Sequence, residues 1–404
     1  MYILKNILLE TGYIREDGRV LATETKTVHL KISDGFITEI MDAEKPLAQE
    51  VETVEGNGLL ALPPFAEKHV HLDKTYMGEP WRACVPAKSV IERSTIEKNI
   101  LSQIGTPTEK RAENLLDVLL SHGSTAVRTH VDIYPEAGLR NLEGVQSALA
   151  NYTHKVDSEI VAFAQHGLLR GNTPALLREA VRNGAGLVGA VDPATVDLNI
   201  EASLVELMDI AVEGGAGIDL HLHDPGHLGT FTMKRLAALT EDAGWQGKVA
   251  VSHAFGLGDV SPQEAKEVAQ LLKEAGVSII SSLPVGRNVP PVALLDEVGV
   301  NVALGNDNIF DSWWPTGNGD VLERLGRLVE MSRWTDELSL SQSLRFITDG
   351  LTPLTKDGEQ VWPVEGDRAN FVLVDATCTA ETVARRAQRK AVFHKGTIVA
   401  GELK

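Results

Sequence analysis

Cysteine is nearly absent from this chain, with only Cys84 and Cys378 among 404 residues. Two cysteines cannot form a disulfide framework or a cysteine-based zinc site, and so low a count is compatible with a reducing compartment. No uninterrupted apolar run reaches the ~18–20 residues that a membrane span requires. The N-terminus, MYILKNILLETGYIRED, lacks the longer apolar core and small-residue cleavage site of a secretory signal. We therefore predict a cytoplasmic protein without a membrane partner.

Positive charge is also scarce. Lys and Arg number 38 against 56 Asp and Glu, which gives a formal net charge of −18. Because phosphate binding needs a basic surface, this balance argues against a nucleic-acid partner, and it disfavours an anionic membrane surface. Apolar residues make up 43% and charged residues 23% of the chain, which is typical of a folded globular protein and excludes a disordered one. The length allows two to three domains, or one large barrel with an appendage.

The middle of the chain alternates between short apolar runs and stretches with helical spacing. Eight runs are found: Leu60–His71, Thr125–Asp132, Ile160–Gln165, Leu187–Asp192, Ile218–His223, Val249–His253, Val277–Ser281 and Val300–Asn306. Stretches between them, such as TEKRAENLLDVLLSHG and SPQEAKEVAQLLKEAG, end in Gly as helix C-termini often do. Eight such units over roughly 290 residues predict a (β/α)8 TIM barrel of the α/β class. A doubly wound open sheet is the alternative, weakened because no G-x-G-x-x-G follows the first run.

Both ends of the chain have a different pattern. The first sixty residues alternate apolar and polar side chains around Gly12, Gly18 and Gly35, and the tail does the same in NFVLV and KAVFHKGTIVAGEL. SDG and HKG lie where hairpin turns are expected. We predict that residues 1–59 and 366–404 together form a small β-sandwich domain, which flanks a barrel domain of residues 60–365.

Histidine is what the chain does have, with twelve residues, and its placement is not even. The ends of the predicted strands hold seven: His69, His71, His130, His166, His221, His223 and His253. In TIM barrels the chemistry lies at these ends, and residues i and i+2 of a strand share a face. One such histidine is more often a hydrogen-bonded core or loop residue, but seven, with Asp307 closing the last strand, predict a convergent metal site. Three imidazoles and a carboxylate with an open position are typical of catalytic zinc or ferrous iron.

Several motifs resemble a known family. HVHLDK after the first strand, a His after the fifth, SHA after the sixth and an Asp after the eighth resemble the amidohydrolase superfamily. PPFAEKHVHLDKT, RTHVDI and FDSWWPTGNGD resemble its cytosine deaminase-like group. AFAQHG, VGAVDPAT and DLHLHDPGHLG are most similar to the N-isopropylammelide isopropylaminohydrolases, which remove an amine from a triazine ring. The resemblance covers nearly the whole chain and includes the split β domain.

The resemblance implies a metal centre and the residues around it. The ligands would be His69, His71, His221 and Asp307, with His253 beside the metal-bound water and Asp307 also taking its proton. Superfamily members with two metals use a carboxylated lysine after strand four, but LVGAVDP has no lysine. We therefore expect one divalent ion, zinc first and iron as the alternative. Such an ion lowers the pKa of bound water toward ~7.

Departures from the family pattern concern the substrate. Cytosine deaminases carry a Glu three residues after the strand-five histidine, whereas this chain has Asp224 there, and we expect His223 and Asp224 to share proton transfer. Asn308 replaces an aspartate that contacts the amine in cytosine deaminases, which argues against cytosine itself. The predicted substrate contacts are Gln165, Lys74, Asp192, Asn308 and Trp314. Trp81 and Trp313 are further candidates for the pocket wall, and each of these residues has an ordinary alternative as a packed, turn or solvated residue.

The leading hypothesis is a metal-dependent hydrolase of a non-peptide C–N bond. It would remove an amino or alkylamino group from a small nitrogen heterocycle by attack of a metal-bound hydroxide. A cyclic or linear amidase of the same superfamily is the alternative among enzymes. A catalytically silent ligand-binding barrel is the alternative of another class, and the intact ligand set argues against it. Because barrels of this superfamily are commonly oligomeric, a homo-oligomer stays open.

Overall fold

The barrel dominates the structure, a computed structural model that describes residues 1–47 and 51–403. Its strands are β6 (Phe65–Val70), β7 (Ser124–Asp132), β8 (Asp157–Ala164), β9 (Leu187–Ala190), β10 (Gly217–His221), β11 (Val249–Ser252), β12 (Val277–Ser281) and β13 (Val302–Leu304). They pair in parallel in sequence order, and a bridge between Val70 and Asp307 joins the first strand to the segment after the last. A doubly wound sheet would reverse its strand order, so the TIM-barrel prediction is confirmed.

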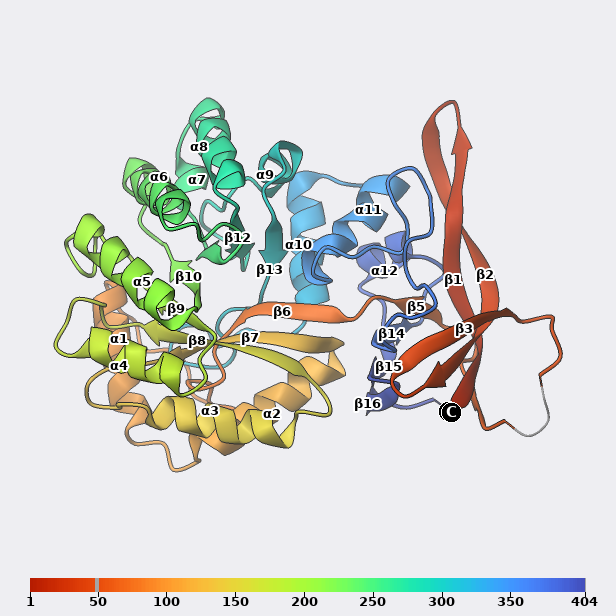
Figure 1. Ribbon diagram of the computed structural model, residues 1–404, viewed down its shortest axis with the longest axis horizontal. Helices are drawn as coiled ribbons and strands as arrows, with labels where there is room; N and C mark the ends of the chain where they lie inside the picture. Colours follow the sequence, from red (N-terminus) through yellow and green to blue (C-terminus); the bar gives the residue numbers. More distant parts are fainter. Residues whose placement is uncertain (48–50, 404) are drawn as a thin grey trace.

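Helices surround these strands, except that α12 lies on the side of the sheet formed by the two ends of the chain (Figure 1). They are α1 (Val90–Leu101), α2 (Thr108–Ser121), α3 (Arg140–Asn151), α4 (Thr173–Arg182), α5 (Ile200–Gly214), α6 (Gly226–Asp242), α7 (Gly256–Asp259), α8 (Pro262–Glu274), α9 (Val292–Val298), α10 (Val321–Ser332), α11 (Glu337–Ser343), the 3-10 helix η1 (Leu344–Ile347) and α12 (Thr379–Arg385). Local signals explain their ends. Ser261 caps α8 by accepting a hydrogen bond from the Glu264 N–H, with Pro262 in the first turn. Gly215 ends α5 in a left-handed conformation.

The two ends of the chain form one mixed sheet beside the barrel (Figure 1). Its strands are β1 (Tyr2–Glu16), β2 (Arg19–Ser33), β3 (Phe36–Asp42), β4 (Thr53–Glu55), β5 (Leu60–Leu62), β14 (Phe371–Val374), β15 (Arg389–His394) and β16 (Thr397–Gly401). The predicted hairpin turns occur, with positive φ at Asp34 and Gly35 and at Lys395 and Gly396. Phe371 stacks on Phe393 in a core that also holds buried residues of β1, β2 and β3. The two ends of the chain therefore form one mixed sheet with a hydrophobic core of its own, separate from that of the barrel.

One predicted strand is divided in the structure. The run Leu60–His71 becomes β5, which pairs with β1 and β14 of the terminal sheet, and β6, which begins the barrel. Pro63 and Pro64 lie between them, where their missing N–H groups interrupt strand pairing. The boundary at residue 59 stays a prediction, and residues 48–50 and 404 of the predicted terminal domain lie outside the described residues.

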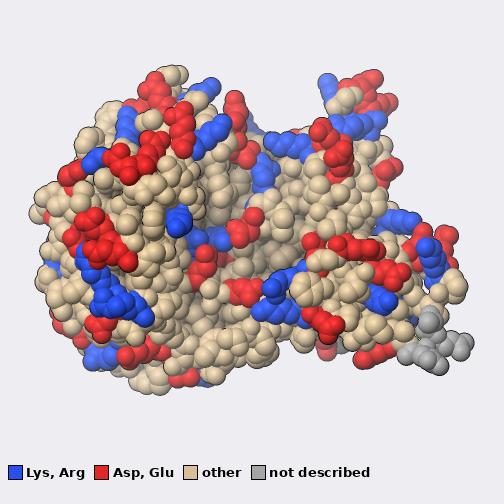
Figure 2. All heavy atoms as spheres, in the orientation of Figure 1, with Lys and Arg blue, Asp and Glu red and all other residues tan. Residues whose placement is uncertain are grey.

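Acidic and basic side chains are intermixed on the face of the molecule that Figure 2 shows, so neither charge covers a large area there. Within the described residues, no helix combines the length and apolar character needed to cross a membrane. Cys84 and Cys378 are both free thiols.

Candidate active site

A cavity of about 500 Å³ opens at the C-terminal ends of the barrel strands. Eleven of the twelve predicted site residues line it: His71, Lys74, Gln165, Asp192, His221, His223, Asp224, His253, Asp307, Asn308 and Trp314. The twelfth, His69, is buried and contacts Asp307. Residues from the ends of six strands and their following loops thus meet in one place, although their chemical roles stay predictions.

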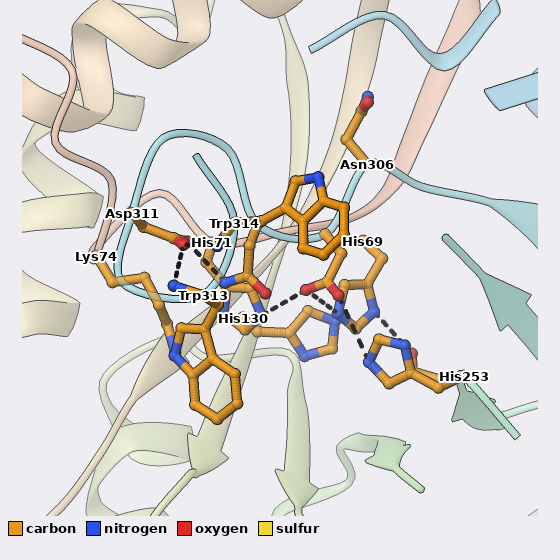
Figure 3. Close-up of polar contacts among 12 residues, drawn as sticks. His69, His71, Lys74, His130, His253, Asn306, Asp311, Trp313 and Trp314 are labelled. Carbon is orange, nitrogen blue, oxygen red and sulfur yellow. Dashed lines mark hydrogen bonds and ion pairs between the residues drawn. The ribbon is translucent and has the colours of Figure 1, made fainter. Parts of the chain in front are cut away.

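Five buried imidazoles form the centre of the site, and we call them the imidazole cluster: His69, His71, His130, His221 and His253. The ring of His69 lies 4.1 Å from His130, 4.6 Å from His221 and 4.9 Å from His253, centroid to centroid. In Figure 3 the rings of His69, His71, His130 and His253 lie around the same point, whereas Asn306 points away. The ring of Phe163 stacks against the face of the His221 ring, with the centroids 4.0 Å apart.

The backbone turns sharply where the strands deliver these groups. His253, Asp307 and Asp192 have φ values of 71°, 64° and 39°, which non-glycine residues adopt rarely. Such conformations cost on the order of 1–3 kcal/mol each and collect at functional sites. Backbone hydrogen bonds within the barrel hold all three. The N–H groups of His253, Asp307 and Asp192 donate to the carbonyl oxygens of Ile280, His69 and His221, respectively.

The donor set fits a divalent metal ion. Asp307 Oδ1 lies 3.3 Å from His71 Nε2 and 3.5 Å from His69 Nε2, and two ligands bonded at ~2.0–2.1 Å in a tetrahedron stand about 3.3 Å apart. Among the described residues, neither ring nitrogen of His221 has a hydrogen-bond partner, and the same holds for His69 Nε2. Two groupings compact enough to hold an ion share His69, one with His130 and His221, the other with His253 and Asp307.

Burial keeps most of these imidazoles neutral. It lowers the pKa of His71 to about 3, with help from the nearby charge of Lys74, and holds the pKa values of His221 and His253 well below the usual value. Burial by itself raises the pKa of Asp307, but the surrounding histidines outweigh it and the net pKa is well below the ordinary one. Neutral imidazoles and an ionised carboxylate are the forms that bind metal.

A second histidine group lies at the cavity wall. His223 Nδ1 is 3.0 Å from Asp192 Oδ2, and its ring stacks on His253 at 4.4 Å. Burial lowers the pKa of His223, but the charge and hydrogen bond of Asp192 reverse the effect, so the net pKa is raised. Asp192 also accepts a hydrogen bond from the Asp224 N–H. Both Asp192 oxygens are therefore occupied, and its predicted contact with substrate stays a prediction.

Asp224 adjoins this pair. One carboxylate oxygen accepts a hydrogen bond from Thr195, and the other has no hydrogen-bond partner in the part of the chain that the structure describes. Burial raises its pKa, and the charge of Asp192 adds to the shift. Asp224 thus offers a free carboxyl oxygen with increased proton affinity in the wall of the cavity.

Lys74 is buried rather than solvated, and with Glu97, Asp132 and Gln165 it forms what we call the Lys74 cluster. Its Nζ lies 3.0 Å from Asp132 Oδ1 and 3.5 Å from Glu97 Oε2, and it donates to Gln165 Oε1 at 3.1 Å. Burial lowers the pKa of Lys74, but the neighbouring carboxylates outweigh it and leave the pKa raised. Burial raises the pKa of Glu97 to about 7, against the opposing charge of Lys74.

The tryptophans divide between the cavity and the surface. Trp313 and Trp314 line the cavity, and Trp313 Nε1 donates to Glu97 at 2.9 Å. Asn308, also in the wall, donates a hydrogen bond to Asp311. The Asp311 carboxylate also accepts hydrogen bonds from the backbone N–H groups of both tryptophans. Trp81 is 70% exposed and does not line the cavity.

Sequence reasoning missed part of this arrangement. It placed His130 at a strand end without a role, yet His130 joins the imidazole cluster. It also placed His166 at a strand end without a role, but that ring packs on Tyr134 and lines a separate cavity. Asp132 was visible in RTHVD, two residues after His130, whereas Glu97 had no signal because it lies on α1, far from any predicted strand end.

Comparisons with known proteins agree with this geometry. A profile described as the amidohydrolase family matches residues 107–403. The uncharacterized protein YahJ of Escherichia coli (strain K12) is 38% identical over 405 residues, which cover 100% of this chain and 88% of that protein.

Two solved structures are similar throughout. The N-isopropylammelide isopropylaminohydrolase from Burkholderia multivorans has a TM-score of 0.86 at 31% identity and covers 99% of each chain. The 5-methylcytosine deaminase from Klebsiella pneumoniae, liganded with 5-fluorocytosine, has a TM-score of 0.81 at 25% identity and covers 99% of this chain and 97% of its own. This chain therefore belongs to the amidohydrolase family and is a metal-dependent hydrolase of carbon–nitrogen bonds.

Proposed function

We propose that the protein removes an amino or alkylamino group from a small nitrogen heterocycle by hydrolysis. His69, His71, His221 and Asp307 would hold one divalent metal ion, zinc first and iron as the alternative. The observation that carries the proposal is the convergence of these groups, with Asp307 Oδ1 at 3.3 and 3.5 Å from two imidazole nitrogens, in a cavity that also holds two proton-transfer candidates.

When bound, a divalent ion supplies Lewis-acid activation of water. The surroundings of the neighbouring carboxylates support one ion rather than two. His71, Asp73 and Asp132 form a further compact grouping, but the Lys74 ammonium already lies 3.0 Å from Asp132. Lys74 thus provides the positive charge that a second ion would bring.

Asp307 and His253 are the groups that we assign to the attacking water. Asp307 Oδ2 lies 4.0 Å from His253 Nε2, which leaves room for one oxygen atom to form hydrogen bonds of about 2.8 Å to both. The ionised Asp307 accepts a proton from this water. His253, as an Nε2–H donor, stabilises the negative charge that develops on the oxygen.

His223 and Asp224 are assigned to the leaving amine. An amine leaves readily only when it is protonated, so a proton donor must stand in the cavity wall. His223 has a raised pKa beside Asp192, and Asp224 has a raised pKa and a free oxygen. Either group can deliver the proton, and we propose that the two share this role.

The heterocycle would lie between the metal site and the aromatic wall. A cavity of about 500 Å³ is within the range of small-molecule sites, ~300–1,000 Å³. The similar structures are named for a triazine aminohydrolase and a methylcytosine deaminase, both of which act on such rings. We propose Gln165, Lys74, Asn308 and Trp314 as contacts to the ring. A cytoplasmic location and a homo-oligomer stay predictions from the sequence.

Amine release tests the proposal. The purified protein, loaded with zinc or with ferrous iron, is assayed with cytosine, pterins, ammelide-type triazines, creatinine-like rings and their N-alkyl variants. We expect ammonia or alkylamine release with the ring intact, and about one metal ion per chain by elemental analysis. Ring opening without amine release would favour the amidase alternative. Metal binding without turnover of any compound would favour a silent ligand-binding barrel.

A further inference from the structure

A chain of hydrogen bonds runs from the imidazole cluster into the barrel interior. His69 Nδ1 lies 2.8 Å from the Ser252 hydroxyl, and that hydroxyl donates to Asp219 Oδ1 at 2.6 Å. Asp219 Oδ2 accepts a hydrogen bond from Arg128 Nη1 at 3.0 Å. His69, Ser252 and Asp219 are all buried, so water cannot substitute for these contacts.

The direction of each bond follows from the chemistry of the groups. An ionised carboxylate only accepts hydrogen bonds, so the single Ser252 hydroxyl proton is committed to Asp219. The Ser252 oxygen must then accept the hydrogen bond from His69, which places the imidazole proton on Nδ1. The other ring nitrogen, Nε2, keeps its lone pair and faces Asp307 Oδ1 at 3.5 Å.

Strand geometry brings these residues together beside the proposed ligands. Asp219 and the proposed ligand His221 are two residues apart on β10 and so share a face, while Ser252 on β11 lies directly opposite His221 in the ladder. Arg128 reaches Asp219 from β7 and also pairs with Glu159 at 3.0 Å. TIM-barrel interiors are usually filled by bulky apolar side chains, so a buried aspartate and serine here are a departure that needs a reason.

We infer that Ser252 and Asp219 are positioning residues that fix the tautomer and ring orientation of His69 for metal binding. This rests on the proposed ligand role of His69. Arg128 balances the buried charge of Asp219, and Asp219 holds the Ser252 proton so that the serine oxygen can only accept. Partners that orient a ligating histidine in this way typically change metal affinity by ~10–100-fold.

Zinc affinity of the metal-free protein tests the inference without any substrate. Zinc chloride is titrated into wild type and Ser252→Ala in competition with a chromophoric chelator. We expect the dissociation constant of Ser252→Ala to rise by ~10–100-fold. Ser252→Thr, which keeps the hydroxyl, should recover most of the affinity. Asp219→Asn should weaken zinc binding, because the amide can donate a hydrogen bond to the serine oxygen, which then no longer has to accept one from His69.

Ser281→Ala is the matched control. Ser281 is fully buried at the same end of the neighbouring strand β12, and within the described residues its hydroxyl takes part in one hydrogen bond, which it accepts from the Leu283 N–H. This variant loses the same atom and should bind zinc as wild type does. Equal zinc affinity in wild type and Ser252→Ala would overturn the inference, as would an equal loss in Ser281→Ala. A wild-type protein that binds no zinc or iron would overturn the proposed ligand set with it, while zinc binding without amine release would refute only the proposed reaction.

Discussion

The imidazole cluster and the Lys74 cluster share one cavity, and both are buried, yet their polar groups are satisfied to different degrees. In the imidazole cluster, both nitrogens of His130, His221 and His253 lack hydrogen-bond partners within residues 1–47 and 51–403. In the Lys74 cluster, by contrast, the ammonium lies between two carboxylates and an amide oxygen. Glu97 Oε2 and Asp132 Oδ1 also lack a hydrogen-bond partner among the described residues, but both face the Lys74 ammonium, so the charges of this cluster balance within the chain.

This difference suggests that the imidazole cluster binds an ion, whereas the Lys74 cluster holds its own side chains in place. A buried polar atom without a partner costs about 1–3 kcal/mol, so a concentration of such atoms indicates a site completed by a bound ion. The opposite charges of the Lys74 cluster balance one another without a ligand. Removing a group from the imidazole cluster should therefore damage chemistry, whereas removing one from the Lys74 cluster should damage the fold as well.

The largest effect on turnover is expected for Asp307→Asn. The amide cannot take a proton from water as a carboxylate does, so kcat should fall by at least about a thousandfold, the scale found when one member of a catalytic unit is removed. Because Asn has nearly the same shape, the metal-free variant should still fold, although it loses the stabilisation that the low pKa of Asp307 reflects. Amine-release kinetics and denaturant unfolding measure the two quantities. Near-wild-type turnover would refute the role of Asp307.

Lys74→Met should lower the free energy of unfolding more than Asp307→Asn does. It leaves the carboxylates of Asp132 and Glu97 buried without their cation, a change that typically costs about 3–5 kcal/mol of unfolding free energy. The loss should be smaller at pH 6 than at pH 8, because the pKa of Glu97, already about 7 beside Lys74, rises further without that charge and the carboxyl takes up a proton. Denaturant unfolding at both pH values gives the comparison.

Lys68→Met is the matched control for that experiment. Lys68 also contacts two carboxylates, Glu159 and Asp349, but those side chains are 45% and 61% exposed. Ion pairs with exposed groups contribute about 0–1 kcal/mol, so Lys68→Met should have a small effect. Equal losses in the two lysine variants would show that burial does not distinguish them.

The sequence predicted the barrel because its strands are buried on both faces and carry continuous apolar runs. It also predicted the hairpin turns, whose Asp-Gly and Lys-Gly pairs adopt the positive φ values that such turns require. It did not predict that Pro63 and Pro64 divide the first run between two sheets. A short run fixes the presence of a strand but not its pairing partner.

The candidate site was predicted from strand ends, and its omissions have a physical cause. Glu97 lies on α1, where the buried residues Ser94 and Glu97 are both polar, so no apolar stripe marks the helix face that meets the cavity. The depth of His130 depends on the register of β7 against β6, in which Thr129 lies opposite Val70. Register between strands so far apart in the chain is set by the closed barrel and is not visible in local sequence.

The smallest expected effect distinguishes a third kind of residue, one that acts only through its neighbour. Asp192→Asn keeps a hydrogen-bond acceptor for His223 but removes the charge that raises the His223 pKa. The pKa of His223 should fall, so the protonated imidazole is lost at a lower pH and the basic limb of the kcat–pH profile should move to lower pH. At the optimum kcat should drop by less than about a hundredfold, the lower end of what a positioned acid contributes. Thr195→Val, which removes a hydrogen bond to Asp224 instead, should leave that limb in place if His223 is the donor. The Thr195 hydrogen bond lowers the pKa of Asp224, and Asp192 raises the pKa of both candidates. A basic limb that moves to higher pH with Thr195→Val would therefore assign proton delivery to Asp224.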